Sequence, residues 1–204
     1  MSDASFWDKA AAKYARDAIG DMAAYEQTRD RMRAILQPHH RVLELGCGTG
    51  STALELADGV ARYTGTDVSP AMIEIARSKQ TDATPAQLDF EVRDARSLPS
   101  GSHDVILALN VLHLLRDLEE VLRLVHAALP SGGLLVAKTA LLKDGAWFLP
   151  WIIPPMRMIG KAPHVRVLGR AELLGLLEKA GFTVTETLLQ EGMAPRLFTV
   201  ATKP

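Results

Sequence analysis

Three glycines at alternate positions, Gly46, Gly48 and Gly50, follow a short apolar run and precede a segment of helical character. Glycine tolerates the backbone of a tight turn and lets a ligand lie directly against the main chain. A helix that begins after such a loop offers free N–H groups and the positive end of its dipole. The acidic residue Glu44 lies two positions ahead of the first glycine. The pattern predicts a cofactor-binding loop, and a tight strand-to-helix turn without a ligand is the alternative.

Two cofactor classes use glycine loops of this kind. The dinucleotide fingerprint is G-x-G-x-x-G/A, and its third glycine position is Ser51 here, so the pattern of an NAD-binding loop is broken. The observed spacing is instead G-x-G-x-G. Cys47 lies between two of these glycines, where a small side chain fits, and we interpret its thiol as a packing group.

Two further carboxylates follow later apolar runs. Asp67 ends the second run, where a carboxylate can accept hydrogen bonds from both hydroxyls of a ribose. NAD-binding folds share this arrangement, so Asp67 alone does not separate the two cofactor classes. The alternative for Asp67 is to cap the helix that begins near Pro70, although Ser69 is better placed for that role. Asp94 ends the third run, where the alternative is a solvated loop carboxylate.

The elements that must position these residues alternate between short apolar runs and helical patterns, which predicts βαβ units. We expect an α/β fold in one domain over residues 1–204: a doubly wound, Rossmann-like, mostly parallel, seven-stranded sheet with helices on both faces. Residues 1–37 are expected to form an N-terminal helical cap, and residues 140–169 an insertion after the fifth strand. Such sheets bind ligands at the carboxyl ends of their strands. The predicted strands are residues 41–45, 62–67, 88–93, 104–109, 134–139, 183–188 and 197–202.

From Trp7 to Thr139 the chain resembles the class I S-adenosylmethionine-dependent methyltransferases. Its N-terminal segment looks like that of small-molecule members related to quinone-biosynthesis methyltransferases. In the class I family an E/D-x-G-x-G-x-G loop holds the methionine part of S-adenosylmethionine, and the product is S-adenosylhomocysteine. The resemblance implies methyl transfer to a small, partly apolar acceptor. The loop residues that it assigns to the cofactor are Glu44, Gly46, Cys47, Gly48 and Gly50, with Glu44 stabilising the ammonium group.

The same resemblance assigns the nucleoside part of the cofactor to residues that follow the second and third strands. Asp67 is expected to accept hydrogen bonds from the ribose hydroxyls, and Val68 and Met72 to form an apolar wall beside the adenine. Asp94 is expected to meet the adenine amino group, while the N–H of Ala95 meets a ring nitrogen.

Candidates near the reacting groups come from two other segments. Asn110, after the fourth strand, is expected to hydrogen-bond the methionyl end of the cofactor. His113 is a candidate base because histidine titrates near neutral pH, but it lies in an apolar helical stretch, where a structural histidine is the alternative. In the small-molecule members that this segment resembles, it folds over the cofactor and its tyrosine approaches the methyl group or the carboxylate, as a catalytic or cofactor-binding residue. Tyr14 is the candidate here, with Tyr25 second, and packing in an amphipathic helix is the alternative.

Residues 146–159 form an apolar segment that contains Trp147, Trp151 and three prolines. The prolines exclude one continuous helix, so the segment is not expected to span a membrane. Residues 143–170 hold five basic residues and one acidic residue, an excess that the whole chain lacks. We expect either a lid over the acceptor or an element that rests on an anionic membrane surface, and a packed insertion with a basic rim is the alternative.

Composition narrows the classes of function further. The formal net charge is −1, from 23 basic and 24 acidic residues, so no general basic field for nucleic acid is expected. A single cysteine excludes an intrachain disulfide, and the six histidines lack metal-ligand spacing, so no metal is expected. No secretory signal or membrane-spanning run is visible, so we expect a cytoplasmic protein, with peripheral membrane contact left open. The oligomeric state also stays open.

Two alternatives to a methyltransferase remain at this point. An NAD-dependent oxidoreductase shares the fold and the role of Asp67. A non-catalytic protein that binds S-adenosylmethionine is the other, and the intact loop from Glu44 to Gly50 argues against it. The lack of a catalytic triad is no objection to an enzyme, because the cofactor carries the reactive group and the protein mainly aligns it.

Overall fold

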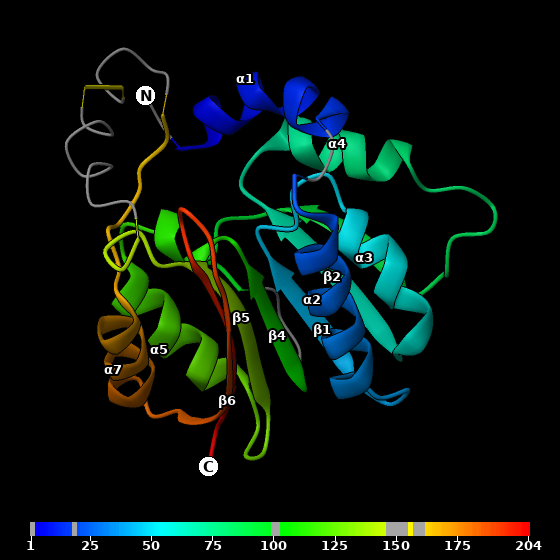
Figure 1. The fold of residues 1–204 in the computed structure, drawn as a ribbon. Helices are drawn as coiled ribbons and strands as arrows, with labels where there is room; N and C mark the ends of the chain where they lie inside the picture. Colours follow the sequence, from blue (N-terminus) through cyan, green and yellow to red (C-terminus); the bar gives the residue numbers. More distant parts are fainter. Residues whose placement is uncertain (1–2, 18–19, 99–102, 146–154, 157–161) are drawn as a thin grey trace.

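The computed structural model describes residues 3–17, 20–98, 103–145, 155–156 and 162–204. Within these residues, seven strands form one sheet in the order β3-β2-β1-β4-β5-β7-β6 (Figure 1). β7 is antiparallel to both of its neighbours, and the other pairs are parallel. The predicted mostly parallel α/β sheet is thereby confirmed. The strands are β1 (Arg41–Leu45), β2 (Arg62–Asp67), β3 (Leu88–Val92), β4 (Val105–Leu109), β5 (Leu134–Ala140), β6 (Thr183–Gln190) and β7 (Arg196–Thr202).

Helices cover both faces of the sheet (Figure 1). Leu43 and Leu45 of β1 belong to the core under α5 and α7, whereas Val42 belongs to the core under α2, α3 and α4. Both faces of β1 are therefore buried, which explains why apolar residues, Val42, Leu43 and Leu45, point to each face of the strand. The helices are α1 (Asp3–Arg16), α2 (Met22–Ile35), α3 (Ser51–Leu56), α4 (Pro70–Ser78), α5 (Leu118–Ala128) and α7 (Arg170–Lys179), with 3₁₀ turns η1 (Ala57–Gly59) and η2 (Leu112–Leu114).

The strand order reverses between β1 and β4. The chain moves outward from β1 through β2 to β3, and then returns to place β4 on the other side of β1. The loops that follow β1 and β4 therefore lie side by side. A Cβ atom added to Gly46, after β1, would lie 2.7 Å from Cγ2 of Val111, after β4. Ligands of open α/β sheets bind at such a reversal.

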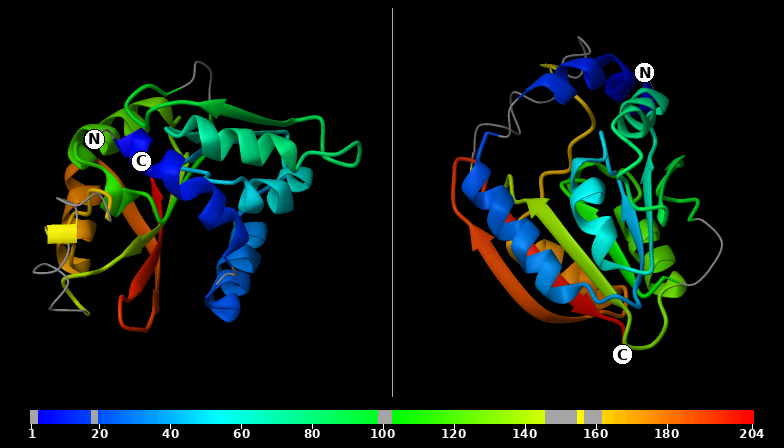
Figure 2. Two further views of the ribbon diagram at one scale, coloured as in Figure 1. Left: turned by 90° about the horizontal axis from the view of Figure 1, so that it is seen from above. Right: turned by 90° about the vertical axis from the view of Figure 1, so that its right-hand side faces the viewer.

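The two N-terminal helices take different positions. Figure 2 shows α1 lying across the end of the molecule while α2 runs along a face of the sheet. α1 is fastened to the start of α4, because Asp8 Oδ1 accepts hydrogen bonds from Ser69 Oγ at 2.6 Å and from the Ala71 N–H at 3.2 Å. α2 is fastened to β5, because Lys138 Nζ donates to Thr28 Oγ1 at 2.8 Å. The cap expected over residues 1–37 thus contains one helix at the strand ends and one on the sheet.

Most of the apolar segment 146–159, including Trp147 and Trp151, lies outside the described residues. The chain on either side of it is held together: the Lys143 N–H donates to the carbonyl oxygen of Leu168 at 3.0 Å, and Asp144 Oδ2 accepts from the Arg170 N–H at 2.6 Å. In the described part of the chain no helix is long and apolar enough to cross a membrane.

Substitution of Gly50 by alanine should destabilise the fold. Gly50 has a φ of +74°, and an added Cβ would lie 2.6 Å from Cζ of Phe90 and 2.9 Å from Cβ of Ala76. Phe90 is fully buried and cannot move aside without disturbing the core. Backbone strain and overpacking together should lower the free energy of unfolding by about 2–4 kcal/mol, measured by equilibrium unfolding in urea.

Gly175 provides the matched control. It lies inside α7 with no atom within 4 Å of an added Cβ, so Gly175→Ala should raise the free energy of unfolding by up to about 1 kcal/mol. Equal stability of Gly50→Ala and the wild type would contradict the described loop.

Candidate functional site

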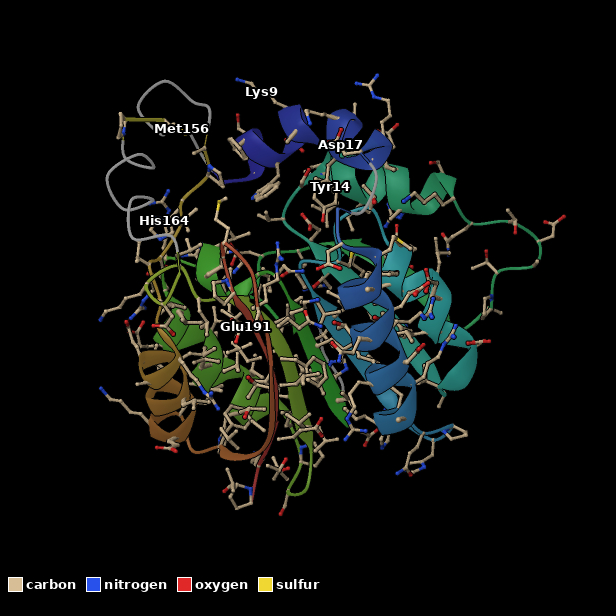
Figure 3. The ribbon with its side chains drawn as sticks, in the orientation of Figure 1. Lys9, Tyr14, Asp17, Met156, His164 and Glu191 are labelled. Carbon is tan, nitrogen blue, oxygen red and sulfur yellow. The ribbon has the colours of Figure 1, made fainter. Side chains whose placement is uncertain are left out.

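An open cavity lies at the carboxyl ends of β1, β2, β3 and β4, beneath α1. Its walls bring together residues that the sequence analysis had selected from five separate segments. Figure 3 shows Tyr14 on the side of α1 that faces the sheet, whereas Lys9 points away from it. The predicted residues that line the cavity are Tyr14, Gly46, Gly48, Asp67, Val68, Met72, Asp94, Ala95 and Asn110.

The glycine loop presents its main chain to the cavity at Gly48. A Cβ added there would have only one neighbour within 4 Å, Cε1 of Tyr14 at 3.8 Å, so the backbone faces open space. Glu44, Cys47 and Gly50 are not part of the cavity lining, although all three were predicted to belong to the site. Cys47 is buried, and burial raises the pKa of its thiol well above the ordinary value, which favours the packing role predicted for it.

Asp67 is held in one orientation by main-chain donors. Its Oδ2 accepts from the Gly48 N–H at 3.0 Å, and its Oδ1 accepts from the Ser69 N–H at 2.9 Å. Burial raises the pKa of Asp67, and these hydrogen bonds act in the opposite direction. Ser69 Oγ accepts from the Met72 N–H at 3.2 Å, so Ser69 caps α4, as the sequence indicated. The Asp67 carboxylate is left on the cavity wall with lone pairs available to a ligand.

Glu44 lies behind the glycine loop and contacts a residue that the sequence analysis did not select. Its Oε2 accepts from the hydroxyl of Tyr63 at 2.9 Å, and the two residues are 2% and 0% exposed. Burial raises the pKa of Glu44 to about 7, while the hydrogen bond from Tyr63 lowers it. The sequence signal that could have identified this contact is a tyrosine within a strand expected to be buried, because a buried tyrosine hydroxyl usually has a hydrogen-bond partner.

The Asp94 side chain is 41% exposed and pairs with Arg96. Its Oδ1 accepts from the main-chain N–H and the Nε of Arg96, and its Oδ2 accepts from Arg96 Nη2 at 2.9 Å. Hydrogen bonds from Arg96 hold the pKa of Asp94 below its usual value. Arg96 also reaches Asp117 at 3.1 Å. A ligand at this end of the cavity therefore meets an ion-pair network, which the sequence analysis missed because it joins β3 and α5.

Asn110 has a φ of 58°, a left-handed conformation that few residues other than glycine adopt. Its N–H donates to the carbonyl oxygen of Lys138 at 2.7 Å, which holds the turn at the end of β4 against β5. Strained backbone of this kind is concentrated at binding sites. The structure thus places Asn110 on the cavity wall beside the glycine loop.

His113 and Tyr25 do not line the cavity. His113 lies in the 3₁₀ turn η2 and not in the helical stretch that the apolar pattern suggested. Burial lowers the pKa of His113 to about 4, with a smaller contribution from the positive charge of Arg196, so its imidazole is neutral at pH 7. Its Nδ1 atom has no hydrogen-bond partner among the described residues. The hydroxyl of Tyr25 donates to Glu55 Oε1 at 2.9 Å.

The remaining wall comes from residues that the sequence analysis did not assign to the site. Trp7 packs edge-to-face against Phe6, with ring centroids 5.2 Å apart, and covers the cavity together with Tyr14. η2 and α5 supply an apolar side beyond Asn110. These residues follow the end of β4, and that position was the signal that could have identified them. The full set of lining residues that were not assigned to the site is Trp7, Thr66, Arg93, Arg96, Leu109, Val111, Leu114, Leu115, Arg116, Asp117 and Val121.

Residues 14–187 match the family described as "Methyltransferase domain". The chain belongs to this family. It is 40% identical over 109 residues to the hybrid PKS-NRPS synthetase apdA of Emericella nidulans, which covers 48% of this chain and 3% of that protein. It is 32% identical over 137 residues to the highly reducing polyketide synthase PKS2 of Leptosphaeria maculans, or 60% of this chain and 5% of that protein. This methyltransferase therefore spans only a small part of the length of these relatives.

A solved structure supports the same fold. Magnesium protoporphyrin IX methyltransferase (ChlM) from Synechocystis PCC 6803 with bound SAH matches with a TM-score of 0.76 at 18% identity, over 100% of both chains. At this identity the likeness concerns the fold alone.

The buried neutral histidine predicts a pH-dependent stability. Unfolded His113 takes up a proton below about pH 6.5, whereas the folded chain resists protonation until about pH 4. Unfolding is therefore linked to proton uptake in this window, and stability falls as the pH is lowered through it. Between pH 6.5 and pH 4 the free energy of unfolding should fall by about 3 kcal/mol more in the wild type than in the His113→Gln variant, measured by unfolding in urea. Parallel pH profiles of the two proteins would contradict this burial.

Proposed function

We propose that this methyltransferase transfers the methyl group of S-adenosylmethionine to a small, partly apolar acceptor. The observation that carries the proposal is the Asp67 carboxylate, which main-chain donors fix on the cavity wall beside the open backbone of Gly48. A carboxylate held in this way suits the two hydroxyls of a ribose, and the adjoining loop leaves room for the rest of a nucleoside.

The other predicted cofactor residues fit a ligand that extends along the strand ends. Glu44 lies behind the loop, where its negative charge favours the ammonium group of the methionine part. Asn110 lies beside that loop, across the strand reversal. At the opposite end, Asp94 and Ala95 are placed to receive the adenine, with Val68 and Met72 as apolar neighbours. Asp94 keeps capacity for a further donor because each carboxylate oxygen has two lone pairs.

S-adenosylmethionine supplies an electrophilic methyl group when it is bound. The chain's own contribution is to align the acceptor with that group and to exclude water. In well-oriented reactions, alignment of this kind lowers the activation barrier by several kcal/mol. Trp7 and Tyr14 cover the cavity from α1 and are placed to do both. The proposal assigns no direct general-base role to His113, because its side chain lies outside the cavity lining.

The class of acceptor is suggested by the wall and by the relatives. Leu114, Leu115 and Val121 form an apolar side, which suits a partly apolar molecule. The relatives are named as polyketide synthases and hybrid synthetases, so a polyketide is the first acceptor class to screen. The kinship to quinone-biosynthesis methyltransferases and the lid over residues 146–159 stay predictions. The family to which the chain belongs leaves the NAD-dependent oxidoreductase without support.

Calorimetric titration of the purified protein tests the cofactor assignment. S-adenosylmethionine and S-adenosylhomocysteine should bind and NAD should not. Asp67→Asn should weaken binding of both by roughly ten- to a hundredfold, because hydrogen bonds to a charged acceptor contribute about 1.5–3 kcal/mol. Asp58→Asn is the control, since Asp58 is exposed in η1. Binding of NAD alone, or equal effects of the two variants, would overturn the assignment.

A further inference from the structure

The contact between Glu44 and Tyr63 lies behind the cavity and is not explained by packing alone. Glu44 follows Leu43 and precedes Leu45 on β1, so its side chain is on the opposite face from theirs, towards α2, α3 and α4. Tyr63 is on the neighbouring strand β2 and belongs to the core on that face. Two polar groups have thus been placed in an apolar core, where their hydrogen bond of 2.9 Å joins adjacent strands.

Among the described residues, the titratable groups whose pKa values are coupled to the charge of Glu44 are acids. Burial raises the pKa of Glu44, and the negative charge of Asp67 at the end of β2 raises it further. Burial raises the pKa of Cys47 in the glycine loop, of Tyr63 on β2, of Tyr25 on α2 and of Tyr14 on α1, and the negative charge of Glu44 adds to each rise. Among the described residues no lysine or arginine forms an ion pair with Glu44. The carboxylate is therefore buried near other negative or neutral groups, and it lacks a cation of the protein's own.

A buried carboxylate without a cation tends to take up a proton, because burial penalises its charged form. The Tyr63 hydroxyl opposes this, since it donates to an ionised acceptor more strongly than to a neutral one. It also fixes the orientation of the carboxylate: Oε2 is used by Tyr63, and Oε1 can accept from a second donor. Charge and orientation are the two properties that a partner for an ammonium group requires.

We propose that Tyr63 is a positioning residue, whose hydroxyl keeps the Glu44 carboxylate charged and oriented to receive the ammonium group of the cofactor. The inference rests on the proposed function, because it assigns Glu44 to the methionine part of S-adenosylmethionine. It has a second consequence: near neutral pH part of the free protein holds a proton on Glu44, and cofactor binding releases that proton.

The first test uses the protein without cofactor. Glu44 has a folded pKa raised from 4.5 to about 7, so its contribution to stability is full below about pH 4.5 and is lost as the pH rises through 7. The hydroxyl of Tyr63 lowers the pKa of Glu44, so its removal in Tyr63→Phe should raise the pKa of Glu44 in the folded protein. The pH at which this stability is lost should therefore rise by about one unit. Tyr25→Phe is the matched control, because the Tyr25 hydroxyl bonds Glu55 and should leave that midpoint in place.

The second test is calorimetry with S-adenosylhomocysteine from pH 6 to pH 9. Tyr63→Phe should weaken binding about tenfold at pH 7 and less at pH 9, where Glu44 is charged in both proteins. In a Glu44→Gln background the same substitution should change neither the affinity nor its pH dependence. For the wild type, the binding enthalpy at pH 7 should vary with the ionisation enthalpy of the buffer, as proton release requires.

The outcomes separate the two proposals. A wild type that binds neither S-adenosylmethionine nor S-adenosylhomocysteine at any pH overturns the proposed function, and the role of Tyr63 towards the cofactor fails with it. Two results with a wild type that binds normally would leave the proposed function intact and overturn the positioning role. In the first, Tyr63→Phe loses the same affinity at every pH. In the second, Tyr63→Phe still weakens binding when it is made in the Glu44→Gln variant.

Discussion

The site depends on buried negative charge that pairs with no lysine or arginine among the described residues. Glu44 and Asp67 lie at the ends of adjacent parallel strands, and burial raises the pKa of both. A small set of hydrogen-bond donors stabilises the two carboxylates. The main-chain N–H groups of Gly48 and Ser69 donate to Asp67, and the Tyr63 hydroxyl donates to Glu44. Such surroundings favour a ligand that is itself positive, because its charge stabilises the ionised form of both carboxylates.

The fold brings these groups together by extending the sheet into the loop. Beyond the last paired residues of β1, the Cys47 N–H donates to the carbonyl oxygen of Thr66 at 2.9 Å, so the glycine loop begins while still bonded to β2. This places Gly48 against Asp67. Two residues further on, Ser69 bonds Asp8 of α1. One short turn therefore carries the Asp67 carboxylate, the cap of α4 and the attachment of the helix that covers the cavity.

The positions of the strand ends could be predicted from the sequence, because apolar runs followed by glycine or by a carboxylate are local patterns. The cap at Ser69 and Pro70 is equally local. The partners of those carboxylates could not be predicted in the same way. That Arg96 also reaches Asp117, and that Tyr63 holds Glu44, depends on how segments distant in the sequence are brought together.

The predicted secondary structure was wrong at the short apolar stretch around His113. Residues 112–114 were expected to be helical, but they form a single 3₁₀ turn between the end of β4 and α5. An apolar run of this length fits a helix, a strand or a turn equally well, and only the packing decides. The same limit applies to the strand order, since nothing local in β7 indicates that it lies between β5 and β6.

That position of β7 has a consequence for the order in which the molecule can assemble. β7 follows β6 among the described residues, yet it pairs with both β5 and β6. During synthesis β1 to β5 can pair as soon as they emerge, but β5 then presents an open edge and β6 has no neighbour to join. Residues 196–202 must emerge before that edge is closed, so a nascent chain halted before residue 196 exposes an unpaired strand of the kind that recruits other chains.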